Sequence, residues 1–223
     1  MRIELKKRII TSILLFILLI LMSLYTYVLI ASLIIIGIIA WIEFYALISK
    51  IYKKRNYNNI ILRFILKAAS LLYLSYLIFI IILCKLNFPD LYLLMIYIIL
   101  ISVMTDIGGL TVGKIFKGKK LTKVSPNKTI SGSVGSFIFS LFLIPFFFKF
   151  LNTYVNMSFF NIVLTTLSIS FISQLGDLFI SVIKRKANVK NTSDLLPGHG
   201  GILDRIDGII FAVPLGILLF KLF

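Results

Sequence analysis

Long apolar runs limit what this chain can fold into more than any other feature. A helix that crosses a bilayer needs about 20 mostly apolar residues. We predict about seven spans, at residues 9–25, 27–48, 64–84, 90–111, 132–150, 158–183 and 207–223, with a turn at 23–27. Runs such as residues 14–22 lack the apolar–polar alternation of β-barrel strands. The sequence therefore predicts an all-α, polytopic transmembrane helical bundle.

The positive charge is distributed unevenly along the chain. Lys and Arg number 24 against 8 Asp and Glu, a net charge of +16, which in a soluble protein would suggest nucleic acid. Here the basic residues cluster at the N-terminus and in the loops after the second, fourth and sixth spans, and only Lys85, Lys149 and Lys221 lie near the other side. The positive-inside rule places these basic segments in the cytoplasm of a bacterial inner membrane, or in the matrix or stroma of an organelle. We expect no nucleic-acid partner.

Two of these loops differ from the rest in composition. Residues 106–132 and 184–207 contain glycine, proline and acidic residues as well as lysine. We interpret them as two functional cytoplasmic loops, and divide the chain into N-terminal transmembrane helices (1–105) and a C-terminal catalytic transmembrane region (106–223). The single cysteine, Cys84, excludes a disulfide framework and a cysteine metal cluster.

The sixth predicted span carries a polar stripe. Gln174, Asp177, Ser181 and Lys184 are spaced by three, four and three residues, which puts them on one helical face. A hydrogen-bonded seam between helices would explain the glutamine and the serine. It explains an aspartate in lipid poorly, because an ionisable group there is costly, so a functional role is favoured for Asp177.

A glycine-rich turn precedes the seventh predicted span. Residues 197–201 read Pro-Gly-His-Gly-Gly, which permits tight backbone geometry and close approach to an anion. Asp204 and Asp207 follow on one helical face, and with Asp177 they are candidate Mg²⁺ ligands. Arg205 could grip a phosphate with two hydrogen bonds. The alternative is a capping and salt-bridge cluster at a helix start.

Four other features carry weaker signals. His199, the only histidine, could orient the turn or bind phosphate, and Asp106 is as well explained by its place at a span end as by a ligand role. Glu43 is either a buried partner for a loop lysine or a substrate-site residue. Residues 108–114 match most of a phosphate-binding loop, but Ile115 occupies the required Ser/Thr position, so we reject that site.

The C-terminal half resembles a known enzyme family. Residues 181–207, which read SVIKRKANVKNTSDLLPGHGGILDRID, closely resemble the signature of phosphatidate cytidylyltransferases, also called CDP-diglyceride synthetases. Residues 174–177, and Asp106 followed by residues 125–129, also resemble family features. The chain departs from the pattern at Asn191, where the family usually has Asp, and at Ser131, where it tends to have Glu; metal occupancy is open on this account.

The resemblance implies transfer of a cytidylyl group from CTP to phosphatidic acid, giving CDP-diacylglycerol and pyrophosphate in phospholipid biosynthesis. The implied cofactor is Mg²⁺, with a second cation as an open option, and the partners are both substrates and membrane lipids, with a homodimer as one option. The implied catalytic residues are Asp177, Lys184, Arg185, His199, Asp204, Arg205 and Asp207, of which the three aspartates would bind metal. The implied substrate-binding residues are Asp106, Ser125, Lys128, Thr129, Ser181, Lys190, Gly200 and Gly201.

Two alternatives explain part of the pattern. The first is another CTP-dependent membrane enzyme, such as a polyprenol or phytol kinase. The second is a transporter or channel without CTP chemistry, which would explain an acid within the membrane. It would not explain why glycine, acid and base cluster in two loops.

Overall fold

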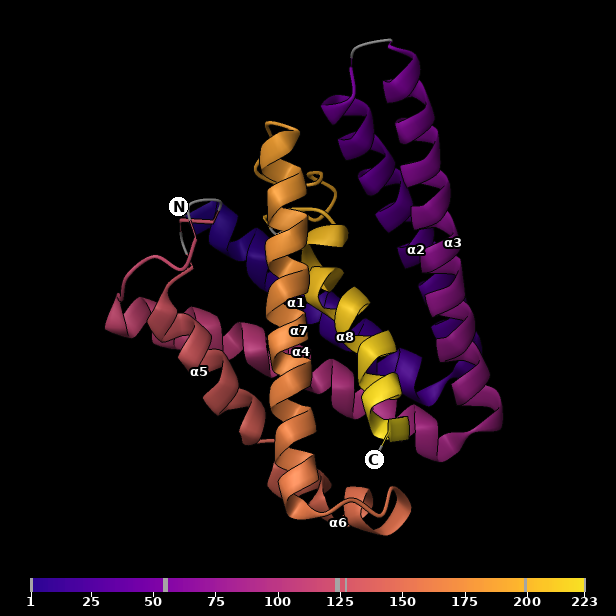
Figure 1. Ribbon diagram of the computed structural model, residues 1–223, viewed down its shortest axis with the longest axis vertical. Coiled ribbons are helices and arrows are strands. Elements are labelled where there is room, and N and C mark those ends of the chain that lie inside the picture. Colours follow the sequence, from indigo (N-terminus) through magenta and orange to yellow (C-terminus); the bar gives the residue numbers. More distant parts are fainter. Residues whose placement is uncertain (1, 54–55, 123–124, 127, 199, 223) are drawn as a thin grey trace. The chain divides into compact units, whose positions relative to one another are not determined.

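The computed structural model describes residues 2–53, 56–122, 125–126, 128–198 and 200–222, and this part of the chain is mostly α-helical (Figure 1). Within it, extended pairing is limited to isolated bridges between Lys120 and Thr129 and between Leu196 and Gly200. The helices are α1 (Arg2–Leu24), α2 (Thr26–Ile51), α3 (Tyr57–Asn87), α4 (Pro89–Phe116), α5 (Ile130–Leu141), α6 (Ile144–Tyr154), α7 (Phe159–Lys186) and α8 (Leu203–Leu222). The all-α prediction is confirmed.

The chain forms two compact units. Unit 1 comprises Met1–Lys85 and Ile183–Ile206, and unit 2 comprises Leu86–Val182 and Asp207–Phe223. Helices α7 and α8 therefore each supply residues to both units. The units reflect packing, so the functional division at residue 105 stays a prediction.

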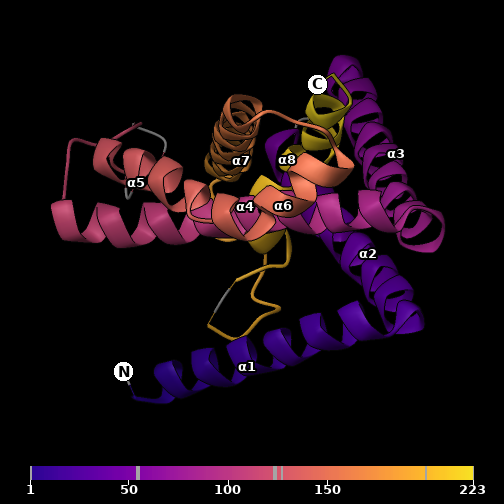
Figure 2. The ribbon, with the colours of Figure 1, turned by 90° about the horizontal axis from the view of Figure 1, so that it is seen from below.

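Unit 1 is built on the antiparallel pair α2 and α3, which lie side by side (Figures 1 and 2). Gly37 of α2 allows the close approach, because a Cβ there would collide with Ile78. The Trp41 indole N–H donates to the Lys67 carbonyl across the pair at 3.1 Å. The helical path breaks at Tyr25, between α1 and α2, as the predicted turn required.

Unit 2 is organised by a seam of small residues between α4 and α5, which lie side by side (Figure 2). A Cβ on Gly108 would lie 2.5 Å from the Gly135 carbonyl oxygen, and one on Gly132 would lie 2.8 Å from that of Gly109. Such small-residue contacts let helix backbones approach closely in membranes. Residues 108–114 are thus helical packing residues, in line with our rejection of a phosphate-binding loop.

Buried hydroxyl groups join α4 to α7 within unit 2. Tyr97 and Thr166 are hydrogen-bonded at 2.7 Å, and the Thr105 hydroxyl donates to Ser170 at 2.8 Å. Polar side chains inside a bundle are stabilised by such interhelical partners. They hold α7, and with it the predicted polar stripe, against α4.

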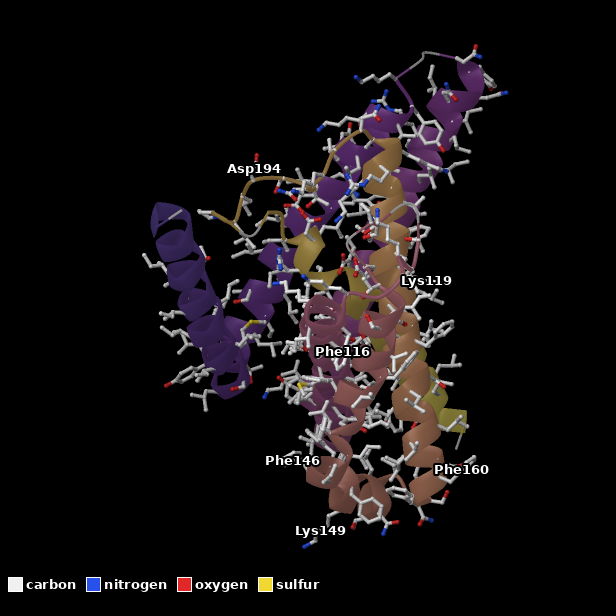
Figure 3. The ribbon with its side chains drawn as sticks, turned by 90° about the vertical axis from the view of Figure 1, so that its left-hand side faces the viewer. Phe116, Lys119, Phe146, Lys149, Phe160 and Asp194 are labelled. Atoms are coloured by element: carbon white, nitrogen blue, oxygen red, sulfur yellow. The ribbon has the colours of Figure 1, made fainter. Side chains whose placement is uncertain are left out.

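The predicted span at 132–150 is bent in the structure. Helices α5 and α6 meet at an angle of 52° around residues 142–143, where Pro145 opens α6. Lys149 of α6 and Phe160 of α7 lie at one end of the unit, well apart from Lys119 of the α4–α5 loop (Figure 3). The two loops of unit 2 therefore leave from different ends.

In the described part of the chain, α2, α3, α4 and α7 are long and apolar enough to cross a membrane, and the bent α5–α6 pair makes a fifth span if it counts as one. The first predicted span overlaps a shorter apolar stretch, Ile13–Leu24. The seventh overlaps α8, whose start carries Asp204, Arg205 and Asp207. A helical membrane bundle is confirmed, while the count of seven stays a prediction.

Candidate functional site

A buried carboxylate in unit 1 anchors the loop that carries the glycine-rich turn. Glu43, on α2, is only 4% exposed. It accepts hydrogen bonds from the hydroxyls of Thr192 (2.8 Å) and Ser193 (2.5 Å), and from the backbone N–H groups of Ile202 (3.1 Å) and Leu203 (2.8 Å). The last two are among the N–H groups that a helix start leaves without intrahelical partners, and an anion there is favoured by the helix dipole. Glu43 thus fixes both the loop and the start of α8.

Asp204 forms the second centre of the same cluster. One carboxylate oxygen accepts from the Lys184 ammonium at 2.6 Å, and the other accepts from the Thr192 N–H (2.9 Å), the Thr192 hydroxyl (3.0 Å) and the Gly201 N–H (3.1 Å). The side chains of Lys184 and Asp204 are 13% and 8% exposed. Burial by itself raises the pKa of Asp204, but the hydrogen bonds and the charge of Lys184 outweigh it and lower that pKa. Asp204 is therefore held as an anion.

The glycine turn has the tight geometry that the sequence predicted. Leu196 and Gly200 exchange backbone hydrogen bonds of 2.9 and 3.1 Å, and Gly200 has φ +84°. A Cβ on Gly201 would lie 2.5 Å from a Glu43 oxygen and would overlap the Thr192 hydroxyl. Only glycine at position 201 lets the backbone reach the carboxylate. His199, predicted to act here, lies outside the described residues.

The polar stripe of α7 continues in unit 2 with a different set of partners. Asp177 forms an ion pair with Lys128 of the α4–α5 loop, and both side chains are 26% exposed. The Ser181 hydroxyl donates weakly to Asp177 at 3.5 Å, and the Ser133 hydroxyl donates to Gln174 at 2.6 Å. Gln174 and Ser133 form the interhelical seam considered above, whereas Asp177 meets a loop cation.

The loop that supplies Lys128 is closed by backbone hydrogen bonds. Lys128 N–H donates to the Ser125 carbonyl at 3.1 Å, and its own carbonyl accepts from Leu121 N–H at 2.8 Å. Thr129 caps α5 by accepting from Gly132 N–H at 3.0 Å. Of the residues predicted to bind substrate here, Ser125 and Lys128 belong to this turn and Thr129 has a structural role that explains its type.

Asp207 is buried in unit 2, where one carboxylate oxygen accepts from Gly208 N–H at 2.9 Å. Its carbonyl lies close to α7, because a Cβ on Gly176 would be 2.8 Å from that oxygen. The small residue before Asp177 therefore allows α7 and α8 to pack at this level.

The remaining predicted residues have exposed side chains. Asp106 is exposed on α4, and Arg185, Lys190 and Arg205 are exposed in unit 1. Asp194, next to the Asn191 departure in the loop, is exposed too, and its carboxylate points outward (Figure 3).

Comparison with known proteins shows which family the chain belongs to. A model of the cytidylyltransferase family matches residues 2–223. The chain belongs to the cytidylyltransferase family. A phosphatidate cytidylyltransferase of Staphylococcus haemolyticus is 42% identical over 120 residues, 53% of this chain and 45% of that protein; one of Bacillus subtilis is 41% identical over 120 residues, 53% of this chain and 44% of that protein. The match spans less than half the length of these relatives.

The metal ligands expected from the family resemblance stay a prediction. Among the described residues, no three His, Cys, Asp or Glu side chains gather as a metal-binding group. Asp177 and Asp204 each bind a lysine instead. Carboxylate oxygens are nevertheless the ligands that Mg²⁺ prefers. The donor types thus fit a hard divalent cation.

The sequence did not reveal that Glu43 contacts Thr192 and Ser193. Its partners in the described structure are hydroxyls and backbone N–H groups rather than a loop lysine, and a role for Glu43 in the substrate site stays a prediction. The sequence features that could have suggested this contact are an acidic residue in an apolar helix and an unbroken polar run at residues 190–194. Because 149 residues separate Glu43 from Thr192, no local spacing could pair them.

Proposed function

We propose that this chain transfers a cytidylyl group from CTP to phosphatidic acid, forming CDP-diacylglycerol and pyrophosphate. Support comes from membership of the cytidylyltransferase family and from relatives named phosphatidate cytidylyltransferase. The observation that carries the proposal is the ion pair of Lys184 and Asp204, which joins two parts of the family signature 20 residues apart through a 2.6 Å contact.

The proposed reaction needs positioning more than a covalent nucleophile. A phosphate oxygen of phosphatidic acid attacks the α-phosphorus of CTP, the bond from that phosphorus to the bridging oxygen breaks, and pyrophosphate leaves. The attacking phosphate is already ionised at neutral pH, so a strong general base is unnecessary. Catalysis would come from orienting the two reactants and stabilising the gathered negative charge.

The cationic side chains supply the contacts that this chemistry requires. We assign phosphate binding to Lys128, Lys184, Arg185 and Arg205. A lysine ammonium has three donors, so Lys184 can bind a phosphate oxygen while it donates to Asp204. Mg²⁺, held by Asp177, Asp204 and Asp207, would neutralise the triphosphate and assist departure of pyrophosphate.

We also propose an orientation for the enzyme. The basic loops would lie in the cytoplasm, where CTP is found, and phosphatidic acid would arrive laterally from the bilayer. A homodimer is the proposed assembly, which light scattering in detergent would test.

The direct test is a product assay on the purified full-length chain. Radiolabelled CTP, phosphatidic acid and Mg²⁺ should yield CDP-diacylglycerol with the wild type, and Asp204→Asn should abolish it. Asp194→Asn changes an exposed acid of the same loop and should retain activity. Folded wild type that makes no liponucleotide would overturn the proposal. Phosphorylation of a polyprenol would then favour a kinase, and solute flux without CTP turnover would favour a transporter.

A further inference from the structure

Helix α2 lines a cavity with its face opposite Glu43. Trp41 and Tyr45 are one helical turn apart, and Glu43 lies two residues from each, so it projects from the opposite side of the helix. Trp41 and Tyr45 line a cavity of about 450 Å³ between α2 and α3. Arg63, Phe64, Lys67 and Leu71 of α3 form much of its other wall.

Lys67 is an unusual residue for such a cavity. It lies inside a helix that can cross a membrane, yet it is only 9% exposed. Its ammonium sits 3.2 Å from the centroid of the Tyr45 ring, a cation–π contact, and its carbonyl accepts from Trp41 and from the Ser70 hydroxyl. The contact with the Tyr45 ring holds the ammonium in place without neutralising its charge.

Arg63 adds a second positive charge to the same wall. It precedes Lys67 by four residues, so the two side chains lie on one face of α3. Across the residues that the structure describes, no Asp or Glu lies within ion-pair distance of either cation. A buried cation without a counterion, such as Lys67, is costly, and an anionic ligand would relieve that cost.

The cavity lining combines two cations with apolar side chains. Arg63 and Lys67 lie toward the start of α3, next to the basic loop after α2, whereas Leu71 lies one turn further along the helix. Phe64 and Leu71 are exposed apolar side chains that offer an acyl chain a surface. Trp41 and Tyr45 are residue types that favour the headgroup level of a bilayer.

We propose that this cavity binds an anionic phospholipid of the surrounding bilayer. Its phosphate would bind Arg63 and Lys67, and an acyl chain would lie along Phe64 and Leu71. A soluble anion would use the two cations but leave the apolar wall without a role. The site requires no CTP chemistry, so it can be tested whether or not the proposed reaction is confirmed.

Trp41, the only tryptophan, makes the test specific to this cavity. The full-length protein is reconstituted in phosphatidylcholine bilayers that contain a small fraction of lipid with brominated acyl chains, which quench a nearby indole. Brominated phosphatidylglycerol should quench Trp41 at a roughly ten-fold lower mole fraction than brominated phosphatidylcholine, because two cations favour the anionic headgroup. Free phosphate cannot produce this signal, because the bromine atoms that quench the indole are on the acyl chains of the lipid.

Substitutions in the cavity give the decisive comparison. Arg63→Gln/Lys67→Met should remove the preference for the anionic lipid, and Arg63→Gln, which leaves the buried lysine in place, should reduce it. Lys50→Gln removes an exposed charge from the end of α2, outside the cavity lining, and should preserve the preference for the anionic lipid.

Equal quenching by the two lipids in the wild type would overturn the proposal. So would a preference that survives the double substitution, which would indicate general attraction to the basic loops, or absence of quenching by either lipid, as expected if a second copy of the chain covers the cavity.

Discussion

The two carboxylate centres are held in different ways. In unit 1, Asp204 is almost buried, and together with Glu43 it is bound by seven donor groups of Lys184, the loop and the start of α8, with the Thr192 hydroxyl shared between the two carboxylates. In unit 2, Asp177 is about a quarter exposed and is held by one lysine and a weak serine contact. The cluster of Glu43 and Asp204 is therefore expected to contribute mainly to stability. The second centre presents a carboxylate that can change partners at little cost. The comparison can be tested by measuring stability and activity separately.

Glu43→Ala should cause the largest loss of stability. It leaves two hydroxyls and two backbone N–H groups without their acceptor, and unsatisfied buried groups cost about 1–3 kcal/mol each, so we expect a loss of about 3 kcal/mol or more. Thermal unfolding in detergent measures it. Glu43→Gln keeps one acceptor oxygen and should lose less. Equal unfolding temperatures for wild type and Glu43→Ala would contradict the anchoring role.

Gly201→Ala should come next. The added methyl group would overlap Thr192 and approach the Glu43 carboxylate, and overpacking of this kind costs about 1–3 kcal/mol. The loop should move away from Asp204, so activity should fall together with thermal stability. A variant that unfolds and turns over like the wild type would show that the loop can shift without consequence.

Thr192→Val should have a smaller effect on the same cluster. The side chain keeps its shape but loses the hydroxyl contacts with Glu43 and Asp204, for an expected loss of about 1 kcal/mol. The Thr192 N–H bond to Asp204 is retained, so activity should fall only modestly. Comparison with Ser193→Ala, measured by the same unfolding assay, tells which hydroxyl matters more. A loss as large as that of Glu43→Ala would mean that the hydroxyl, not the carboxylate, organises the loop.

Of these variants, Asp177→Asn should change stability least, and it best separates the Asp177 centre from the Glu43 and Asp204 centre. A partly exposed ion pair contributes about 0–1 kcal/mol, so the unfolding temperature should barely move. Activity should nevertheless fall about 10²-fold if Asp177 acts on the charge that develops in the reaction. Lys128→Gln, assayed in parallel, removes the partner. A large drop in stability with activity unchanged would reverse the assignment of the two centres.

The helices were predictable because a bilayer leaves a spanning chain little choice of structure. Lipid cannot satisfy backbone groups, so apolar runs become helices, and the turn at Tyr25 and the glycine turn followed from residue type. The break between α5 and α6 was missed, although Pro145 signalled it. Local spacing correctly placed Gln174, Asp177, Ser181 and Lys184 on α7. It could not reveal that Glu43 binds a loop more than 140 residues away, because nothing in a local pattern encodes a distant partner.

The glycine seam of unit 2 has a consequence for how substitutions in this family are interpreted. Gly108, Gly109 and Gly113 on α4 meet Gly132 and Gly135 on α5 so closely that an added methyl group would meet backbone or side-chain atoms at every one of the five positions. A saturation mutagenesis screen should therefore find a row of intolerant sites at helical spacing in this pair. Such a row has the statistical appearance of an active site, yet it marks where two helices pack closely against each other.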